Sequence, residues 1–254
     1  MNTFSIVIPM FNASKTIKKT LDSCLTQIYS PKEIIIVDDC SADDSMQVVR
    51  QWKKNYNGDI KIVLEKQEPN AGPSKARNRG WELASGEYIS FLDADDYFVP
   101  EKLAEIHHVL LENKDIILLG HNYTLENKEV KSSDSLNHIL TKNLLLKNLT
   151  TTPSVIVKRE ILERFDENMH YTEDHDLWLR ITEQYDKTYF LDRVLTTIGR
   201  PVRSEGGQSA NLWAMRKGEI IMYKKFCKRN SIMLLFPLFA IFSLSKHVLK
   251  MLKG

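Results

Sequence analysis

The chain has 254 residues, enough for one large α/β domain or two small ones. Hydrophobic residues make up 43% and charged residues 27%, a composition that allows a sizeable core and an ordinary soluble surface. The net charge of +2 is unevenly distributed, because residues 220–254 hold seven Lys or Arg and no Asp or Glu. Subtracting these seven charges leaves −5 for residues 1–219. A basic tail on an acidic body predicts an anionic surface as the partner of the tail.

The three cysteines, Cys24, Cys40 and Cys227, are widely spaced and form neither a CxxC pair nor a zinc-ligand pattern. We therefore expect a reducing, cytoplasmic compartment. The N-terminus runs directly into a strand pattern, with no basic segment and no cleavage site, so no secretory signal is expected.

The first 120 residues alternate short, continuously apolar runs with helical patterns. Apolar runs of this kind indicate strands of a parallel sheet that is covered on both faces. The predicted strands are 4–9, 33–38, 60–65, 88–92 and 115–120. The predicted helices between them are 15–27, 43–56, 74–84 and 101–112. Right-handed crossovers would then give an α/β fold with a mostly parallel, doubly wound sheet and helices on both faces.

The pattern loosens after residue 120. Residues 122–134 are polar and are predicted to form a loop, and 135–146 a helix. Residues 153–157 and 187–198 read as strands, and 173–185 has helical periodicity.

The C-terminal tail, residues 220–254, ends in two unusual segments. Residues 232–242 are uniformly apolar, with Pro237 expected to interrupt a helix, and 244–252 are amphipathic with lysines. About 20 apolar residues are needed to span a membrane, so this run is short. We expect an apolar and amphipathic helical tail that lies in the membrane interface, with its basic residues toward anionic head groups. The alternative is a helix packed on the domain or on a second subunit, which leaves a homodimer open.

Four polar segments lie where the predicted parallel strands end. They are Pro-Met-Phe-Asn at 9–12, Asp-Asp-Cys-Ser at 38–41, the Gly- and Arg-containing segment at 70–80, and Asp-Ala-Asp-Asp at 93–96. The carboxyl ends of parallel strands meet at one edge, where open α/β sheets bind ligands. An Asp-rich turn alone is usually a solvated connection. At this edge, however, carboxylates suit a hard divalent cation that holds a diphosphate.

Together, Pro-x-Phe-Asn, Val-Asp-Asp-x-Ser-x-Asp, Gly-x-x-x-Ala-Arg-Asn-x-Gly and Asp-x-Asp resemble the motifs of family 2 glycosyltransferases of the GT-A fold. Residues 173–180, Glu-Asp-His-Asp-Leu-Trp-Leu-Arg, look like the acidic catalytic motif of that family. The resemblance covers about residues 3–210. It implies a glycosyltransferase domain at 1–219, with a nucleotide-sugar-binding half at 1–120 and an acceptor-binding half at 121–219. Residues 220–254 would be the membrane-associating tail.

The resemblance implies a set of nucleotide-sugar-binding residues: Pro9, Phe11, Asn12, Asp39, Arg77, Asp93, Ala94 and Arg203. Asp39 would accept a hydrogen bond from the uracil ring N–H, since a carboxylate is a pure acceptor. Alternatively Asp39 caps the following helix, a role that Asp38 also suits. Phe11 would stack on the base or simply pack in the core.

Arg77 would reach the base or a phosphate, with Arg79 as the alternative. Arg200, Arg203 and the glycines at 206–207 would form a basic loop that closes over the diphosphate, or a plain surface loop.

In the Asp-x-Asp pair, the resemblance implies that Asp93 contacts the ribose and that Asp95 coordinates the metal. Asp93 belongs to the same metal site, and Asp96 would join through water. Mn²⁺ or Mg²⁺ would bridge the two phosphates and stabilise the leaving nucleoside diphosphate. No His or Cys stands nearby at ligand spacing, which argues against zinc.

The resemblance makes Asp174 the general base that takes a proton from the acceptor hydroxyl, with Glu173 orienting the loop or the acceptor. The choice between the two acids stays open because geometry decides it. Both also complement the positive end of the predicted helix. His175 is expected at the surface, and Trp178 and Trp213 are expected in the core or at an acceptor platform.

The resulting hypothesis is an inverting hexosyltransferase that uses a UDP-sugar, with glucose or galactose favoured. The acceptor would be a membrane-borne, polyprenyl-diphosphate-linked saccharide in O-antigen, lipopolysaccharide or other surface polysaccharide biosynthesis. The protein would lie at the inner face of the cell membrane, and no nucleic acid partner is expected. Two alternatives are a sugar-nucleotide nucleotidylyltransferase, although no Gly-rich loop follows the first strand, and an inactive membrane scaffold of the same fold.

Overall fold

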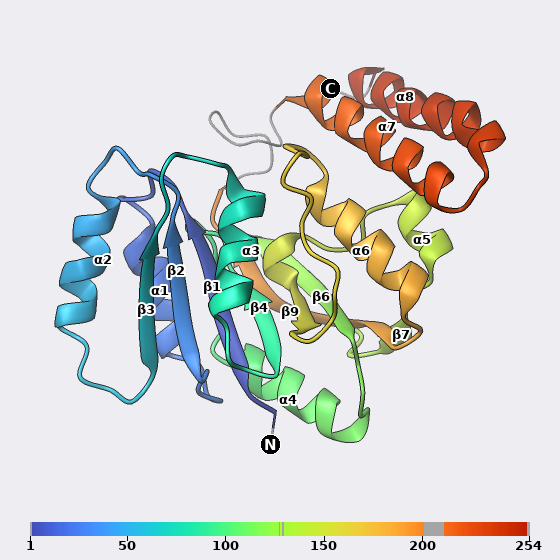
Figure 1. Cartoon of the computed structure of the whole chain (residues 1–254). Helices are drawn as coiled ribbons and strands as arrows, with labels where there is room; N and C mark the ends of the chain where they lie inside the picture. Colours follow the sequence, from blue (N-terminus) through green and yellow to red (C-terminus); the bar gives the residue numbers. More distant parts are fainter. Residues whose placement is uncertain (1, 127, 129, 201–210, 253–254) are drawn as a thin grey trace.

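The computed structural model describes residues 2–126, 128, 130–200 and 211–252. The strands of this part are β1 (Phe4–Met10), β2 (Glu33–Asp38), β3 (Lys61–Lys66), β4 (Tyr88–Phe91), β5 (Tyr97–Phe98), β6 (Leu118–Leu125), β7 (Leu136–His138), β8 (Val155–Lys158) and β9 (Thr188–Ile198). They form one sheet in the order β3-β2-β1-β4-β8-β6-β9-β5, with β7 paired to β9 (Figure 1).

The helices are α1 (Ile17–Leu25), α2 (Ser45–Lys54), α3 (Pro73–Leu83), α4 (Lys102–Glu112), α5 (Thr141–Leu146), α6 (Glu173–Gln184), α7 (Leu212–Arg229) and α8 (Phe236–Leu252). Two 3₁₀ turns, η1 (Thr152–Ser154) and η3 (Met233–Leu235), complete the described secondary structure.

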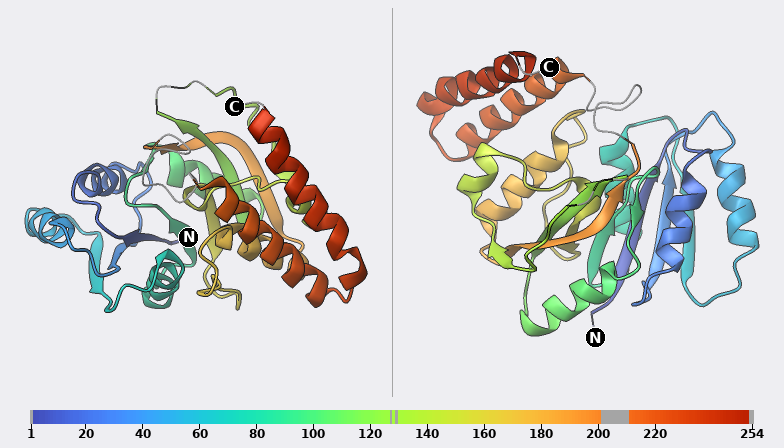
Figure 2. Two further views of the ribbon diagram at one scale, coloured as in Figure 1. Left: turned by 90° about the horizontal axis from the view of Figure 1, so that it is seen from above. Right: turned by 180° about the vertical axis from the view of Figure 1, so that it is seen from behind.

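Helices cover both faces of the sheet because neighbouring strand residues point to opposite sides. On β1, Val7 joins a core cluster with residues of α3, α6 and α7, whereas Ile6 and Ile8 join a second cluster with residues of α1, α2 and α4. Figures 1 and 2 show the two helix layers from the front and from behind. The predicted α/β class with a central sheet and helices on both faces is confirmed.

The sheet is parallel only in part. Strands β3, β2, β1 and β4 are parallel neighbours, as are β6 and β9. Strand β8 is antiparallel to both β4 and β6, and the short strands β5 and β7 are antiparallel to β9. The four strands β1 to β4 are therefore parallel as predicted, while β8 separates β6 from this parallel group.

Three segments before the C-terminal helices differ from the sequence-based expectation. The first is the short strand β5, which was not predicted and forms by pairing with β9. The predicted loop at 122–134 begins as strand, because β6 continues to Leu125 along β9. The predicted helix at 135–146 divides into β7 and the short α5. Leu136 lies opposite Leu191, and the Ile139 N–H donates to the Thr188 carbonyl (2.8 Å). Pairing with the edge of β9 thus outweighs the local helical pattern, as tertiary context commonly does.

The C-terminal helices form a hairpin that packs on the domain (Figure 1). Helix α7 crosses the domain boundary predicted at residues 219/220, and its Met222, Tyr223 and Phe226 belong to the core. Pro237 does not interrupt a helix: it stands in the first turn of α8, where a backbone N–H has no helical partner. No helix within the described residues combines the length and apolar character needed to cross a membrane.

A buried carboxylate joins the amino ends of the parallel strands. Glu33 at the start of β2 is fully buried and accepts hydrogen bonds from Ser5 Oγ (2.7 Å), Ser85 N (2.6 Å) and Lys61 Nζ (3.0 Å). Burial by itself would raise the pKa of Glu33, but these donors outweigh it and lower the pKa to about 2. The ionised carboxylate therefore links β1, β2, β3 and the loop before β4.

This arrangement predicts a specific acid sensitivity. A carboxyl group with a lowered folded-state pKa stabilises the fold above its unfolded pKa of about 4.5, and the stabilisation is lost as the pH falls toward about 2. We expect Glu33→Gln to be less stable than wild type at pH 7 by about 2–3 kcal/mol, and the difference to shrink toward pH 2. Urea unfolding across that pH range measures this, and a pH-independent difference would contradict it.

Candidate active site

The loops after β1 and β2 are joined side by side at the carboxyl edge of the sheet. Met10 pairs with Asp38 at the ends of the two strands. Beyond them, the Asn12 N–H donates to Ser41 Oγ (3.0 Å), and the Ala42 N–H donates to Asn12 Oδ1 (2.8 Å). Asn12 takes a positive φ of 49°, a conformation that asparagine tolerates.

Pro9 and Phe11, which precede Asn12 in the same motif, lie at the same edge. Pro9 is partly buried in β1, whereas Phe11 is 52% exposed. The aromatic ring therefore does not pack in the core and is available to a ligand such as a nucleotide base.

Asp39 is only 3% exposed, and its carboxylate is occupied by internal donors. It accepts hydrogen bonds from Gln67 Nε2 (2.6 Å), Ala71 N (2.8 Å) and Gly72 N (2.8 Å). Asp39 thus anchors the loop that leads into α3, where Gly72 has a φ of 89° that a side chain would strain. A carboxylate has about four acceptor positions, so one remains for a base N–H. The base contact stays a prediction beside this structural role.

Arg77 connects three elements at the centre of the edge. Its guanidinium donates to Asp93 Oδ1 after β4 (2.8 Å) and to Glu173 Oε1 at the start of α6 (3.1 Å). The Arg77 and Glu173 side chains are both buried. Arg79 is different: it is partly exposed and pairs with Glu65 and Glu82 on the surface. Of the two arginines, Arg77 is therefore the one that faces the site.

The Asp-x-Asp segment places three carboxyl groups close together. Asp93 and Asp95 are partly exposed, whereas Asp96 is buried and accepts a hydrogen bond from the Gly199 N–H (2.9 Å). Burial and the neighbouring Asp93 raise the pKa of Asp95, and they raise the pKa of Asp96 to about 8. Ala94 between them is buried.

The donors at this segment fit a hard divalent cation. Carboxylate oxygens are the ligands that Mg²⁺ and Mn²⁺ prefer, and a cation would relieve the repulsion that raises these pKa values. Among the described residues, no three His, Cys, Asp or Glu side chains are grouped closely enough to hold a metal by themselves. An ion held by Asp93 and Asp95 would accordingly take further ligands from water and from the donor's phosphates.

The acid pair at the start of α6 divides into a buried and an accessible member. Glu173 is buried on Arg77, and burial raises the pKa of Glu173 to about 7. Asp174 is partly exposed and accepts hydrogen bonds from the His175 N–H (2.7 Å) and from Asn148 Nδ2 (3.3 Å). Burial also raises the pKa of Asp174. Asp174 is therefore the acid that an incoming hydroxyl can reach, which favours it as the base.

The positions of His175, Trp178 and Trp213 can be compared with the expectations from the sequence. The expectation of a surface His175 is wrong: the ring is buried and its Nε2 hydrogen-bonds to the Leu144 carbonyl (2.6 Å). Trp178 belongs to the core, where it packs edge-on against Phe165. Trp213 is half exposed on α7.

The basic loop contributes one described residue. Arg200 Nε lies 2.8 Å from Asp95 Oδ2, so this guanidinium neutralises the carboxylate that is predicted to bind metal. Arg203, predicted to contact the donor, lies outside the described residues.

Sequence reasoning missed three supporting residues of the site. Asn148 orients Asp174, Gln67 fixes Asp39, and Gly199 approaches the Asp95 carbonyl so closely that a Cβ would lie 2.0 Å from it. Asn148 and Gln67 belong to no motif that the sequence analysis identified. Only the glycine carries a sequence signal, at the point where β9 ends.

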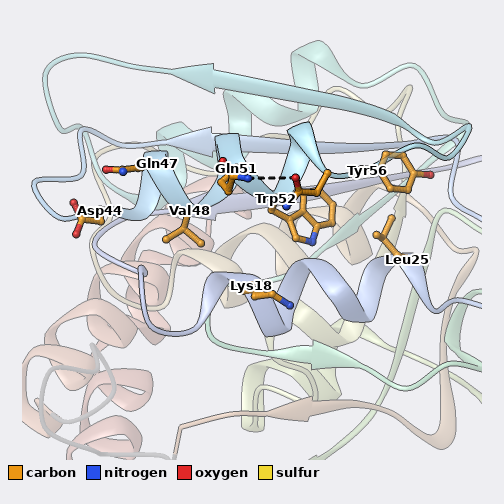
Figure 3. Close-up of a pocket in the computed structure, with 9 residues that line it drawn as sticks. Lys18, Leu25, Asp44, Gln47, Val48, Gln51, Trp52 and Tyr56 are labelled. Atoms are coloured by element: carbon orange, nitrogen blue, oxygen red, sulfur yellow. Dashed lines mark hydrogen bonds between the residues drawn. The ribbon is translucent and has the colours of Figure 1, made fainter.

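A groove of about 640 Å³ lies elsewhere, between α1 and α2 (Figure 3). It is lined by Lys18, Leu25, Asp44, Gln47, Val48, Gln51, Trp52, Asn55 and Tyr56. None of the predicted site residues lines it, so it is separate from the motif-bearing edge of the sheet.

The Arg77 ion pairs make a stability prediction. Arg77→Ala leaves Asp93 and the buried Glu173 without their shared cation, which should lower the free energy of unfolding by about 3–5 kcal/mol. Arg79→Ala, two residues away on the exposed side of α3, should cost less than about 1 kcal/mol. Urea denaturation at pH 7 measures the free energy of unfolding of both variants. Equal losses in Arg77→Ala and Arg79→Ala would show that Arg77 does not compensate buried charge.

Comparison with known proteins agrees with the motifs. The model of the family described as "Glycosyl transferase family 2" matches residues 5–165. An uncharacterised glycosyltransferase of Haemophilus influenzae is 33% identical over 184 residues, which cover 70% of this chain and 71% of that protein. The Escherichia coli enzyme WfgD, named a UDP-Glc:α-D-GlcNAc-diphosphoundecaprenol β-1,3-glucosyltransferase, is 32% identical over 70% of this chain and 68% of its own. The amylovoran biosynthesis glycosyltransferase AmsB of Erwinia amylovora is 30% identical over 88% and 76%.

Solved structures share the fold. S. aureus TarS in complex with UDP-GlcNAc superimposes with a TM-score of 0.74 at 20% identity, over 96% of this chain and 72% of that one. A Pyrobaculum calidifontis mannosyltransferase bound to GDP-Man and Mn²⁺ gives a TM-score of 0.66 at 16% identity, over 100% and 76%. The family match and the relatives lead to one conclusion: the chain belongs to glycosyltransferase family 2 and is a glycosyltransferase of the GT-A fold.

Proposed function

We propose that the enzyme transfers a hexose from a UDP-sugar, with inversion, to a hydroxyl group of a lipid-linked saccharide during polysaccharide biosynthesis. One observation carries the proposal: Arg77 holds Glu173 and Asp93 together, so the accessible Asp174 stands beside the Asp-x-Asp edge. A base and a diphosphate-binding edge are then close enough to act on one donor sugar.

Each residue of the site has a proposed role in binding or in proton transfer. Phe11, Asn12 and Asp39 receive the nucleotide, with Pro9 and Ala94 shaping the backbone around it. Asp93 and Asp95 face the ribose and the diphosphate, and Mn²⁺ or Mg²⁺ held there would neutralise the leaving nucleotide. Asp174, oriented by Asn148, accepts the proton of the attacking hydroxyl. Arg203 is proposed to contact the diphosphate.

The relatives support the choice of donor and acceptor. WfgD and WfaP of Escherichia coli are both named for transfer from UDP-Glc to a diphosphoundecaprenol-linked sugar. Glucose is therefore the favoured donor sugar, with galactose second. A lipid-linked acceptor also agrees with the proposed location at the inner face of the cell membrane, with the membrane surface as a partner.

The base assignment makes a kinetic prediction. Asp174→Asn removes the proton acceptor, so kcat should fall by about 10²–10⁴-fold while the affinity for UDP is retained. Burial raises the pKa of Asp174, so this carboxylate becomes protonated at a higher pH than an ordinary aspartate. Wild-type activity should therefore be lost, as the pH falls, at a pH above the usual pKa of an aspartate. Transfer assays with UDP-glucose and a synthetic diphosphate-lipid acceptor, together with UDP titration, measure both effects.

Glu173→Gln is the comparison for that experiment. It removes the ion pair with Arg77 and should lower stability as well as activity. If Asp174→Asn turns over at the wild-type rate and only Glu173→Gln loses activity, Glu173 rather than Asp174 is the base.

The cation site makes a second prediction. Chelation of divalent ions should abolish transfer, and Mn²⁺ or Mg²⁺ should restore it. Asp95→Asn should weaken the Mn²⁺-dependent part of UDP binding in calorimetric titration, whereas Asp59→Asn, at an exposed position outside the site, should leave it unchanged. Full activity after chelation would rule out the proposed cation site.

A further inference from the structure

An exposed apolar face runs along the outer side of the C-terminal hairpin. Leu234 in η3 is 95% exposed, and Leu238 and Ile241 in α8 are 64% and 63% exposed. Leu238 and Ile241 are three residues apart and so lie on one side of α8, and the exposed Leu234 precedes that helix in η3. Met233, Leu235 and Leu244 are exposed beside them. A continuous exposed apolar patch of this kind marks an interaction surface.

The opposite side of α8 is firmly held by α7. Phe239 stacks on Tyr223 at 5.0 Å between ring centroids and meets Phe226 edge-on. Buried Glu219 of α7 accepts a hydrogen bond from Ser243 Oγ (2.6 Å) and pairs with Lys246. Because its inner face is occupied in this way, α8 can present only its outer face to a partner.

The charge of the hairpin complements an anionic partner. Residues 220–254 contain seven Lys or Arg and no acidic residue. Three of the seven, Lys225, Arg229 and Lys246, are paired with carboxylates of the protein. Lys224 and Lys228 are exposed along one side of α7, and neither forms an ion pair among the described residues, so these two are available to an anionic partner. Together, exposed leucines and an isoleucine on η3 and α8 and solvated lysines on α7 match the composition of a segment that lies in a membrane interface. Each such lysine is attracted to anionic head groups.

Helix α7 of the hairpin also packs directly on Tyr171 and Thr172, which precede the acid pair Glu173 and Asp174. Gly218 of α7 packs so closely on Tyr171 and Thr172 that a Cβ would lie 2.6 Å from the Tyr171 carbonyl oxygen. Thr172, with a φ of 59°, immediately precedes Glu173 and Asp174. Figure 1 shows α7 and α8 at the end of the molecule toward which β1 and β2 point. A surface that holds the hairpin therefore also sets the orientation of the acid pair.

We propose that the outer face of η3 and α8, formed by Leu234, Leu238 and Ile241, docks on an anionic lipid surface and so orients the active-site edge toward it. The proposal extends the membrane partnership proposed above by assigning the residues that make the contact. It does not depend on the transfer reaction, and its test uses vesicles that carry no acceptor.

The test is flotation of the full chain with vesicles of phosphatidylethanolamine and phosphatidylglycerol. Wild type should bind these vesicles, bind phosphatidylcholine vesicles weakly, and lose affinity as salt is added. The double variant Leu234→Glu/Leu238→Glu should bind at least about tenfold more weakly, which corresponds to about 1.4 kcal/mol. UDP binding by this variant should equal that of wild type, since neither leucine belongs to the site.

The matched control is Leu111→Glu/Leu162→Glu, which makes the same charge change at leucines that are 56% and 87% exposed outside the hairpin. It should bind vesicles as wild type does, apart from the shared electrostatic effect. Equal weakening in both double variants would overturn the proposal, as would absence of wild-type binding. Sedimentation velocity tests whether the same face joins two subunits. If the wild type does not bind vesicles but forms a dimer, and only Leu234→Glu/Leu238→Glu dissociates that dimer, the face is a subunit interface and the proposal is overturned.

Discussion

The Arg77 guanidinium is the contact on which the site depends. A buried cation needs compensating carboxylates, and Arg77 finds one after β4 and another at the start of α6. These elements are far apart in the sequence and belong to the two halves of the domain. The charge pairing holds the N-terminus of α6, with its acid pair, against the Asp-x-Asp segment after β4.

Two kinds of interaction build the two sides of this edge. On the side of β1 and β2, backbone N–H groups donate to side chains: those of Ala71 and Gly72 to Asp39, and that of Ala42 to Asn12. These bonds fix the conformation of the loops. The acidic side instead gathers carboxylates whose burial and mutual repulsion raise the pKa of Asp95, Asp96 and Asp174. Acids with shifted pKa values cluster at functional sites.

Strands β1 to β4 were predictable because they are mostly apolar runs and each connection between them is a single helix. The short β5 was not, since it is a strand only through its pairing with β9. Predicted strand 33–38 coincides with β2, and predicted helix 74–84 differs from α3 by one residue at each end. The second half was less predictable, since β7 and the end of β6 are strands only through their pairing with β9. His175 was misplaced for the same reason, because the carbonyl of Leu144 that accepts its hydrogen bond comes from α5.

By itself, the sequence determined the class of fold, the family and the short motifs, because each of these is written in residues that lie close together along the chain. Only the tertiary structure decided which arginine faces the site and which acid is accessible. It also decided that Asp39 anchors a loop and that Asn148 orients Asp174. These roles depend on burial and on partners up to 96 residues away, as between Arg77 and Glu173. Local propensity and motif spacing carry no information about contacts of that range.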